Sequence, residues 1–256
     1  MGEYNFAIFR ARGARTERLY DTAYRYWSTY AITYVFGRRL SGRVDVLDAG
    51  GRDGGTLRLL ENLNLTGTYT CMDLVPTMVR PTRSNFDIEI VQSSFADFRP
   101  TRKYDAVLFE SSLDCCGDYR EIAWLADCLK PGGFVVVTLG ARGTRPLWYG
   151  FWDRGGCHVL DRDEIPPAFA AIGLKVVELF PLLGLTSRLA HWLIQIKLAW
   201  YCRGVWHKTL ARAIPPLARV DPMRLPNRIL NEITWRLDRL LPFWRAGHCI
   251  VLERAA

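Results

Sequence analysis

The sequence lacks the cysteine spacing of a metal site or a disulfide framework. Its seven cysteines are an odd number, they form no Cys-x-x-Cys pair, and several fall in predicted core segments. This usage favours buried thiols in a reducing compartment. The first residues also lack an apolar core of signal-peptide length. We therefore expect a cytoplasmic protein without a metal centre.

Long apolar runs and internal repeats are missing as well. Arg188 and Lys197 interrupt the apolar stretch around them well short of the roughly 18 residues that a membrane-spanning helix needs. With 49% hydrophobic and 23% charged residues, the composition instead suits one α/β domain with a sizeable core and one or two appendages.

Short apolar segments alternate with helical ones along most of the chain. The alternation predicts a doubly wound, Rossmann-like, mostly parallel sheet that helices cover on both faces. Asp118 and Asp161 are the expected caps of helices over 119–129 and 162–172. The seven strands are expected at 44–49, 67–73, 88–91, 104–110, 133–139, 173–181 and 248–252.

The first predicted strand runs into a glycine-rich turn that opens a helix. Gly50, Gly51 and Gly54 permit a tight turn and close approach of the backbone to a ligand. Asp73, at the end of the next strand, comes about 20 residues later, where a ribose-binding carboxylate is expected. Together these features predict a site for a nucleotide-shaped cofactor.

Further along the chain, Lys130-Pro131-Gly132-Gly133 precedes the fifth strand. The order of Asp48-x-Gly50, the strand-end acid Asp73 and this turn resembles class I S-adenosylmethionine-dependent methyltransferases, over residues 44–182 plus the last strand. The resemblance implies an antiparallel last strand and S-adenosylmethionine as the cofactor.

The same resemblance assigns roles within the cofactor site. Asp48 and Glu110 would contact the methionine end, and the glycine loop would pass beneath the cofactor. Asp73, followed by Leu74, would hold the ribose. Ser94 and Phe95 stand where the family often has an Asp-Ala pair near the adenine, so Ser94 would bond the exocyclic amine and Phe95 would stack on the ring. Arg52 replaces the usual middle glycine and narrows the permitted backbone angles.

Residues 16–39 are predicted to form a helix. Its aromatic stripe could be ordinary core packing, or it could line an acceptor pocket in a lid over residues 1–42, as in similar methyltransferases. The stripe consists of Tyr20, Tyr24, Trp27, Ala31 and Tyr34, which share one helical face.

The segment 183–245 interrupts the connection between the last two strands. It holds eleven Lys and Arg against three Asp and Glu, a net charge of +8 that equals the net charge of the whole chain, and five of the nine tryptophans. Such a basic, Trp-rich helical insertion is typical of an in-plane membrane helix. A cap on the sheet edge and, less favoured, a nucleic-acid surface are the alternatives. An apolar helix face is expected from Ile229, Leu230, Ile233, Leu237, Leu240 and Leu241.

The sequence thus predicts four parts: a lid (1–42), the cofactor domain (43–182), the insertion (183–245) and the last strand (246–256). Methyl transfer to a hydroxyl needs a base, and Asp114 and His158 follow the fourth and fifth strands. Each could instead have a structural role. We expect O-methylation of a small-molecule or lipid-linked acceptor, such as a glycan or isoprenoid, by a peripheral protein at the inner membrane surface. The alternatives are an inactive scaffold subunit and an RNA methyltransferase.

Overall fold

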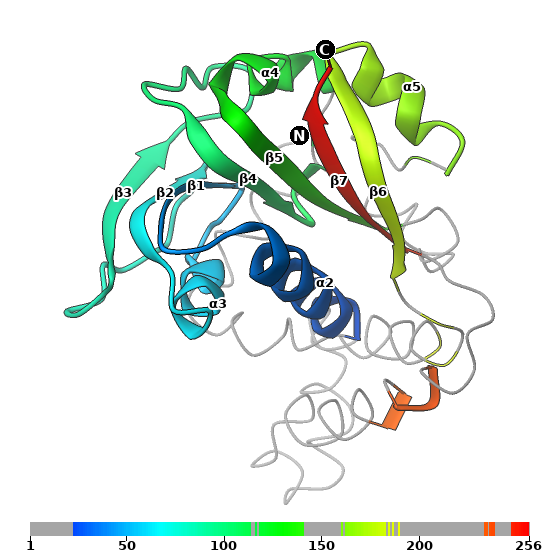
Figure 1. The fold of residues 1–256 in the computed structure, drawn as a ribbon, viewed down its shortest axis with the longest axis horizontal. Helices are drawn as coiled ribbons and strands as arrows, with labels where there is room; N and C mark the ends of the chain where they lie inside the picture. Colours follow the sequence, from blue (N-terminus) through cyan, green and yellow to red (C-terminus); the bar gives the residue numbers. More distant parts are fainter. Residues whose placement is uncertain are drawn as a thin grey trace, which may run out of the picture.

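A computed structural model describes most of the cofactor domain. The described residues are 23–113, 116, 118–140, 160, 162–182, 184, 186, 189, 233–234, 236–238 and 247–255, with side chains from residue 28 onward. They include one seven-stranded sheet in the order β3-β2-β1-β4-β5-β7-β6 (Figure 1). Its strands are β1 (Arg43–Ala49), β2 (Thr66–Asp73), β3 (Phe86–Gln92), β4 (Tyr104–Glu110), β5 (Leu129–Gly140), β6 (Leu174–Leu182) and β7 (Gly247–Arg254).

The pairing of the strands confirms the predicted topology. β1 lies between β2 and β4, and the four pairs from β3 to β5 are parallel. β7 is antiparallel to both β5 and β6, as the resemblance implied. The strand order reverses between β1 and β4, which is where open α/β sheets bind their ligands.

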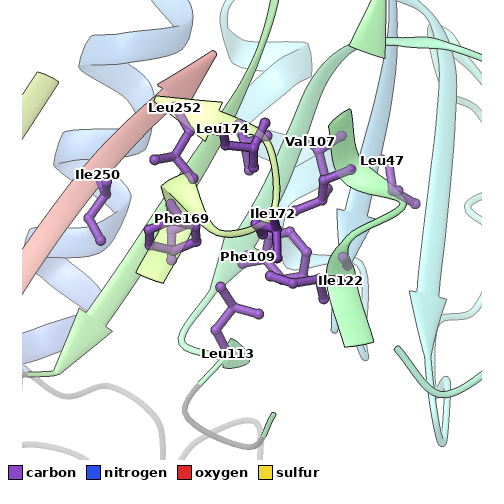
Figure 2. Close-up of a cluster of buried hydrophobic side chains, with 14 of the residues drawn as sticks. Leu47, Val107, Phe109, Leu113, Ile122, Phe169, Ile172, Leu174, Ile250 and Leu252 are labelled. Atoms are coloured by element: carbon purple, nitrogen blue, oxygen red, sulfur yellow. The ribbon is translucent and has the colours of Figure 1, made fainter. Parts of the chain in front are cut away.

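Helices cover both faces of the sheet. α2 (Ala23–Arg39) and α3 (Gly55–Asn62) contact each other on one face, where Val46, Tyr69 and Leu108 are buried beneath them. The other face carries η3 (Tyr119–Ile122), α4 (Leu125–Cys128) and α5 (Ile165–Ala170). Figure 2 shows the apolar core on this second face, which joins strands and helices through Leu47, Val107, Phe109, Leu113, Ile122, Phe169, Ile172, Leu174, Ile250 and Leu252.

The buried face of α2 differs from the predicted aromatic stripe. Ala31 is buried as expected, but Tyr34 is 46% exposed and lies edge-on to Phe180. The residues that enter the core are Ile32, Val35 and Phe36, each fully buried. Positions 32, 35 and 36 share the helix face that meets the sheet, and Tyr34 lies outside that face. Tyr20, Tyr24 and Trp27 lie outside the described side chains.

The helix expected over 119–129 is divided into η3 and α4. Asp118 caps η3, because its carboxylate accepts a hydrogen bond from the Arg120 backbone amide at 2.8 Å. β5 already begins at Leu129, since Lys130 reaches Asp45 and Asp105 at 2.7 Å each and fastens this turn to β1 and β4. The Lys130–Gly133 turn therefore has a structural role at the end of the sheet opposite the predicted cofactor site.

The second predicted cap, Asp161, lies outside the described residues, and α5 begins only at Ile165. The cysteines that the structure describes, Cys71, Cys116, Cys128 and Cys249, are all buried free thiols, as expected. Among the described helices, none is long and apolar enough to cross a membrane. The division of the chain at 42, 182 and 245 stays a prediction.

Candidate functional site

The glycine-rich turn lies at the carboxyl end of β1 and requires glycine for steric reasons. Gly50 has φ +82°, and a Cβ there would lie 2.3 Å from the Cβ of Ser112. Gly54, which precedes α3, has φ +71°, and a Cβ there would lie 2.5 Å from the sulfur of Met78. The Gly50 amide donates to the Met72 carbonyl at 2.6 Å, so the turn is tied to β2. Only glycine meets both demands at these positions.

Arg52, the departure from the family pattern, adopts a glycine-like conformation. Its φ is +39°, which costs a non-glycine residue about 1 kcal/mol. Hydrogen bonds hold it there: its amide donates to Asp73 at 3.2 Å and its carbonyl accepts from Thr77 at 2.8 Å. The side chain therefore does not prevent the loop from forming.

Asp48 is a buried acid directly beneath the loop. It is 1% exposed, and a Cβ on Gly51 would lie 2.6 Å from its carboxyl carbon. The Tyr69 hydroxyl donates to Asp48 at 2.5 Å. Burial raises the pKa of Asp48 to about 7, the Tyr69 hydrogen bond opposes this rise, and the charge of Glu110 adds to it. The acid is thus poised to carry its charge when a positive group lies nearby.

Asp73 ends β2 beside the same loop and is half-buried. One carboxylate oxygen accepts from the Val75 amide at 2.8 Å and the other from the Arg52 amide at 3.2 Å. These bonds fix the carboxylate, and each oxygen keeps a lone pair for another donor. The next residue, Leu74, is held through its backbone: its carbonyl accepts a hydrogen bond from the Gln92 side-chain amide at 3.2 Å.

Glu110 ends β4, next to the strand that carries Asp48. Its carboxylate accepts from the Ser28 hydroxyl of α2 at 2.7 Å. The following residue, Ser111, has φ +53°, and its amide bonds to Thr138 of β5. A strained residue held by a neighbouring strand is a feature of functional sites. It sets the direction in which the chain leaves β4.

Ser94 and Phe95 follow β3, and the structure places them differently. The Phe95 ring lies 3.7 Å from where a Cβ on Gly50 would be, and it packs edge-on to Phe109 at 5.5 Å. The Ser94 hydroxyl donates to Asp97 at 2.6 Å and accepts from the Asp97 amide. Phe95 is therefore beside the glycine loop as predicted for a stacking residue, whereas Ser94 is engaged in a local turn and keeps only an acceptor lone pair.

The structure brings together Asp48, Asp73, Glu110, Phe95 and the three loop glycines at one edge of the sheet. Asp114 and His158 lie outside the described residues, so their role as base stays a prediction. No group of potential metal ligands occurs in the part of the chain that the structure describes.

Sequence reasoning missed Ser28, Tyr69 and Ser112, which support the site from outside the motifs. Tyr69 is buried on β2 and Ser28 lies within a helix. Ser112 donates to the Ala49 carbonyl at 2.7 Å and so joins the ends of β1 and β4. Each of the three stands beside other hydroxyl residues in the sequence, so no local pattern distinguishes it.

The arrangement fits S-adenosylmethionine. A Cβ at Gly50 or Gly51 would collide with Ser112 or Asp48, so glycine lets the loop pack closely against the ends of β4 and β1. Asp73 offers two fixed acceptors to a diol, Phe95 offers a ring face near the loop, and Asp48 and Glu110 offer negative charge to an ammonium group. These groups suit the ribose diol, the adenine ring and the ammonium group of the cofactor.

Comparison with known proteins agrees with this assignment. A family model described as a methyltransferase domain matches residues 20–179, more than half of the chain. The chain belongs to the methyltransferase-domain family. It is a class I S-adenosylmethionine-dependent methyltransferase by family and fold, with S-adenosylmethionine as the cofactor of the family.

Solved structures share the fold of this methyltransferase at low sequence identity. A Haloferax volcanii protein in complex with the Trm112 methyltransferase activator is 18% identical, with a TM-score of 0.61 and coverage of 97% of this chain and 96% of the other. A Geobacter sulfurreducens S-adenosylmethionine-dependent methyltransferase in complex with S-adenosylhomocysteine is 15% identical (TM-score 0.51, coverage 89% and 90%).

The cyclase SpnF also shares the methyltransferase fold, with 17% identity, a TM-score of 0.53 and coverage of 88% and 80%. A search of curated protein sequences found no match. These structures show the fold of the chain but do not identify its methyl acceptor.

Proposed function

We propose that this methyltransferase transfers a methyl group to an oxygen of a small-molecule or lipid-linked acceptor at the inner membrane surface. The observation that carries the proposal is the convergence of Asp48, Asp73 and Glu110 on the glycine loop. S-Adenosylmethionine supplies a methyl group on a sulfonium leaving group that is already activated. The protein then has to align the acceptor and take up its proton.

The candidate bases favour an oxygen acceptor. A hydroxyl must lose its proton during transfer, and Asp114 follows Glu110 by four residues while His158 comes after β5, which ends at Gly140. Both segments leave the sheet at the carboxyl edge, where the cofactor residues are. The segments that carry Asp114 and His158 therefore begin at the end of the sheet where the cofactor residues lie.

The insertion supports contact with an anionic membrane surface. The insertion follows Leu182, the last residue of β6, and the chain re-enters the sheet at Gly247, the first residue of β7. These two residues pair at the end of the sheet where the cofactor residues lie. A lipid-linked acceptor held by the insertion would thus lie on the side of the cofactor. The net charge of +8 over 183–245 is the complement that acidic headgroups require.

The described part of the insertion supports an exposed membrane-binding surface more than a cap that is buried against the sheet. Asp238 is 2% exposed, and Thr186 donates to it through its amide at 2.9 Å and its hydroxyl at 2.7 Å, so both ends of the insertion are joined. Leu189, Ile233 and Leu237 remain exposed around this joint. Exposed leucine and isoleucine beside basic residues are typical of an interfacial helix.

The alternative of an inactive scaffold subunit has less support. It would be favoured by a distorted loop at Arg52, yet Arg52 keeps the glycine-like conformation that the loop needs. SpnF illustrates that the fold can serve a cyclase, so binding of the cofactor and transfer of the methyl group need separate tests. An RNA acceptor is the remaining alternative for the basic insertion.

Calorimetric titration with S-adenosylhomocysteine tests the site. Asp73→Ala should weaken binding at least tenfold, because it removes charge-assisted hydrogen bonds worth about 1.5 to 3 kcal/mol each. Asp87→Ala is the matched control, since Asp87 is an exposed acid on neighbouring β3. Equal affinity of the folded Asp73→Ala protein and the control would exclude the ribose assignment.

Transfer of labelled methyl groups to cell-envelope lipid, small-molecule and RNA extracts then separates the alternatives. We expect label in the lipid or small-molecule fraction. Binding without transfer to any fraction would favour the scaffold, and label in RNA alone would contradict the proposed acceptor.

A further inference from the structure

The N-terminal helix reaches the cofactor edge through one buried residue. Ser28 of α2 is 0% exposed, and its hydroxyl donates to Glu110 at 2.7 Å across a separation of 82 residues. Glu110 is half-buried at the end of β4. A hydroxyl in the interior of a helix commonly bonds to its own backbone. Here its partner is an acid at the predicted methionine end of the cofactor.

The opposite end of α2 is anchored independently of Ser28. Arg38 and Arg39 form ion pairs with Glu178 of β6 at 2.7 Å, and Arg39 also pairs with Glu253 of β7 at 2.9 Å. Between these ion pairs and Ser28, the helix buries Ile32, Val35 and Phe36 in the core. The helix is thus anchored at this end, and loss of one hydroxyl should leave it in place.

The Ser28 hydrogen bond acts on the direction of Glu110. A hydroxyl that donates to a carboxylate restricts the rotamers of that carboxylate. Glu110 lies close enough to Asp48 for its charge to raise the pKa of Asp48. A donor on α2 therefore holds the Glu110 carboxylate in one direction near Asp48.

We propose that Ser28 is a positioning residue that holds Glu110 for the methionine end of the cofactor, and that α2 is thereby part of the cofactor site. The inference rests on the proposed binding of the cofactor at this edge. It implies that cofactor binding and the order of α2 are coupled.

A double-mutant cycle tests the link, with S-adenosylhomocysteine as the probe in calorimetry. Ser28→Ala should weaken binding about tenfold, and Ser28→Ala in a Glu110→Ala background should cause no further loss. Thr33→Ala is the matched control on the same helix, because the Thr33 hydroxyl bonds only locally to the Thr29 carbonyl among the contacts described for it. We expect its affinity to stay within about twofold of wild type.

Hydrogen exchange provides a second readout, which does not depend on affinity. Addition of S-adenosylhomocysteine should slow amide exchange in α2 of the wild-type protein and of Thr33→Ala, but not of Ser28→Ala. Unchanged affinity in Ser28→Ala, or an equal loss in the Glu110→Ala background, would overturn the inference while leaving the cofactor site intact. Absence of binding to the wild-type protein would overturn the proposed site and this inference together.

Discussion

Replacing Asp48 by asparagine should make the cofactor-free protein more stable at pH 8. The pKa of Asp48 rises from 3.8 to about 7 on folding because the carboxyl group is buried. Between these values the folded protein holds a proton that the unfolded chain releases, so the free energy of unfolding falls as the pH rises from about 4 to 7. At 1.36 kcal/mol per pKa unit, the loss approaches about 4 kcal/mol at pH 8.

Asparagine has nearly the same shape and no charge, and its carbonyl oxygen can still accept from Tyr69. We therefore expect Asp48→Asn to exceed wild type by up to about 4 kcal/mol at pH 8 and to lose most of this advantage at pH 4.5. Urea denaturation at the two pH values measures the difference. Asp87→Asn, which alters an exposed acid on β3, is the control and should show little change.

Calorimetry on the same Asp48→Asn protein should show weaker binding of S-adenosylhomocysteine, because the ammonium group of the ligand loses a charged partner. Identical pH dependence of the unfolding free energy in Asp48→Asn and wild type would refute the argument that burial controls this acid. Greater stability with unchanged ligand affinity would retain the burial argument but remove Asp48 from the binding site.

Three further predictions concern the loop, the base and the insertion. Gly50→Ala should abolish S-adenosylhomocysteine binding in calorimetry, whereas Gly132→Ala, at a similar φ of +76° but with no atom within 4 Å, should bind normally. Asp114→Asn or His158→Ala should lower turnover about 100-fold at unchanged cofactor affinity, and near-normal turnover in both would place the base elsewhere. At low salt, the protein should sediment with liposomes that contain acidic lipids and less with neutral liposomes. A failure to sediment with acidic liposomes would contradict the membrane proposal. Glutamine should remove most of this binding when it replaces Arg228, Arg236 and Arg239.

The sequence was sufficient to predict the sheet and the cofactor edge because both depend on local patterns. Alternating apolar strands predicted seven strands, and all seven occur. The glycines of the loop and Asp73 were recognisable because their chemistry needs particular residue types at particular spacings. The family resemblance placed Phe95 near the adenine, and in the structure its ring lies beside the glycine loop.

Predictions that depend on how helices and strands pack against one another were less accurate. Of the predicted stripe, Ala31 is buried but Tyr34 is exposed, because helical periodicity identifies faces but does not say which face meets the sheet. The helix over 119–129 was interrupted for a similar reason: the Lys130 ion pairs with Asp45 and Asp105 hold the start of β5 at Leu129, and these pairs join residues far apart in the chain.

By itself, then, the sequence determined the α/β class, the seven strands with an antiparallel last one, the glycine turn and the acids near the carboxyl ends of β1, β2 and β4. Only the tertiary structure decided how those acids are held: Tyr69 beneath Asp48, the Arg52 amide on Asp73, and Ser28 on Glu110. Strand and turn signals arise from neighbours within a few residues. The charge and direction of a buried carboxylate depend on donors that folding brings from 21 to 82 residues away.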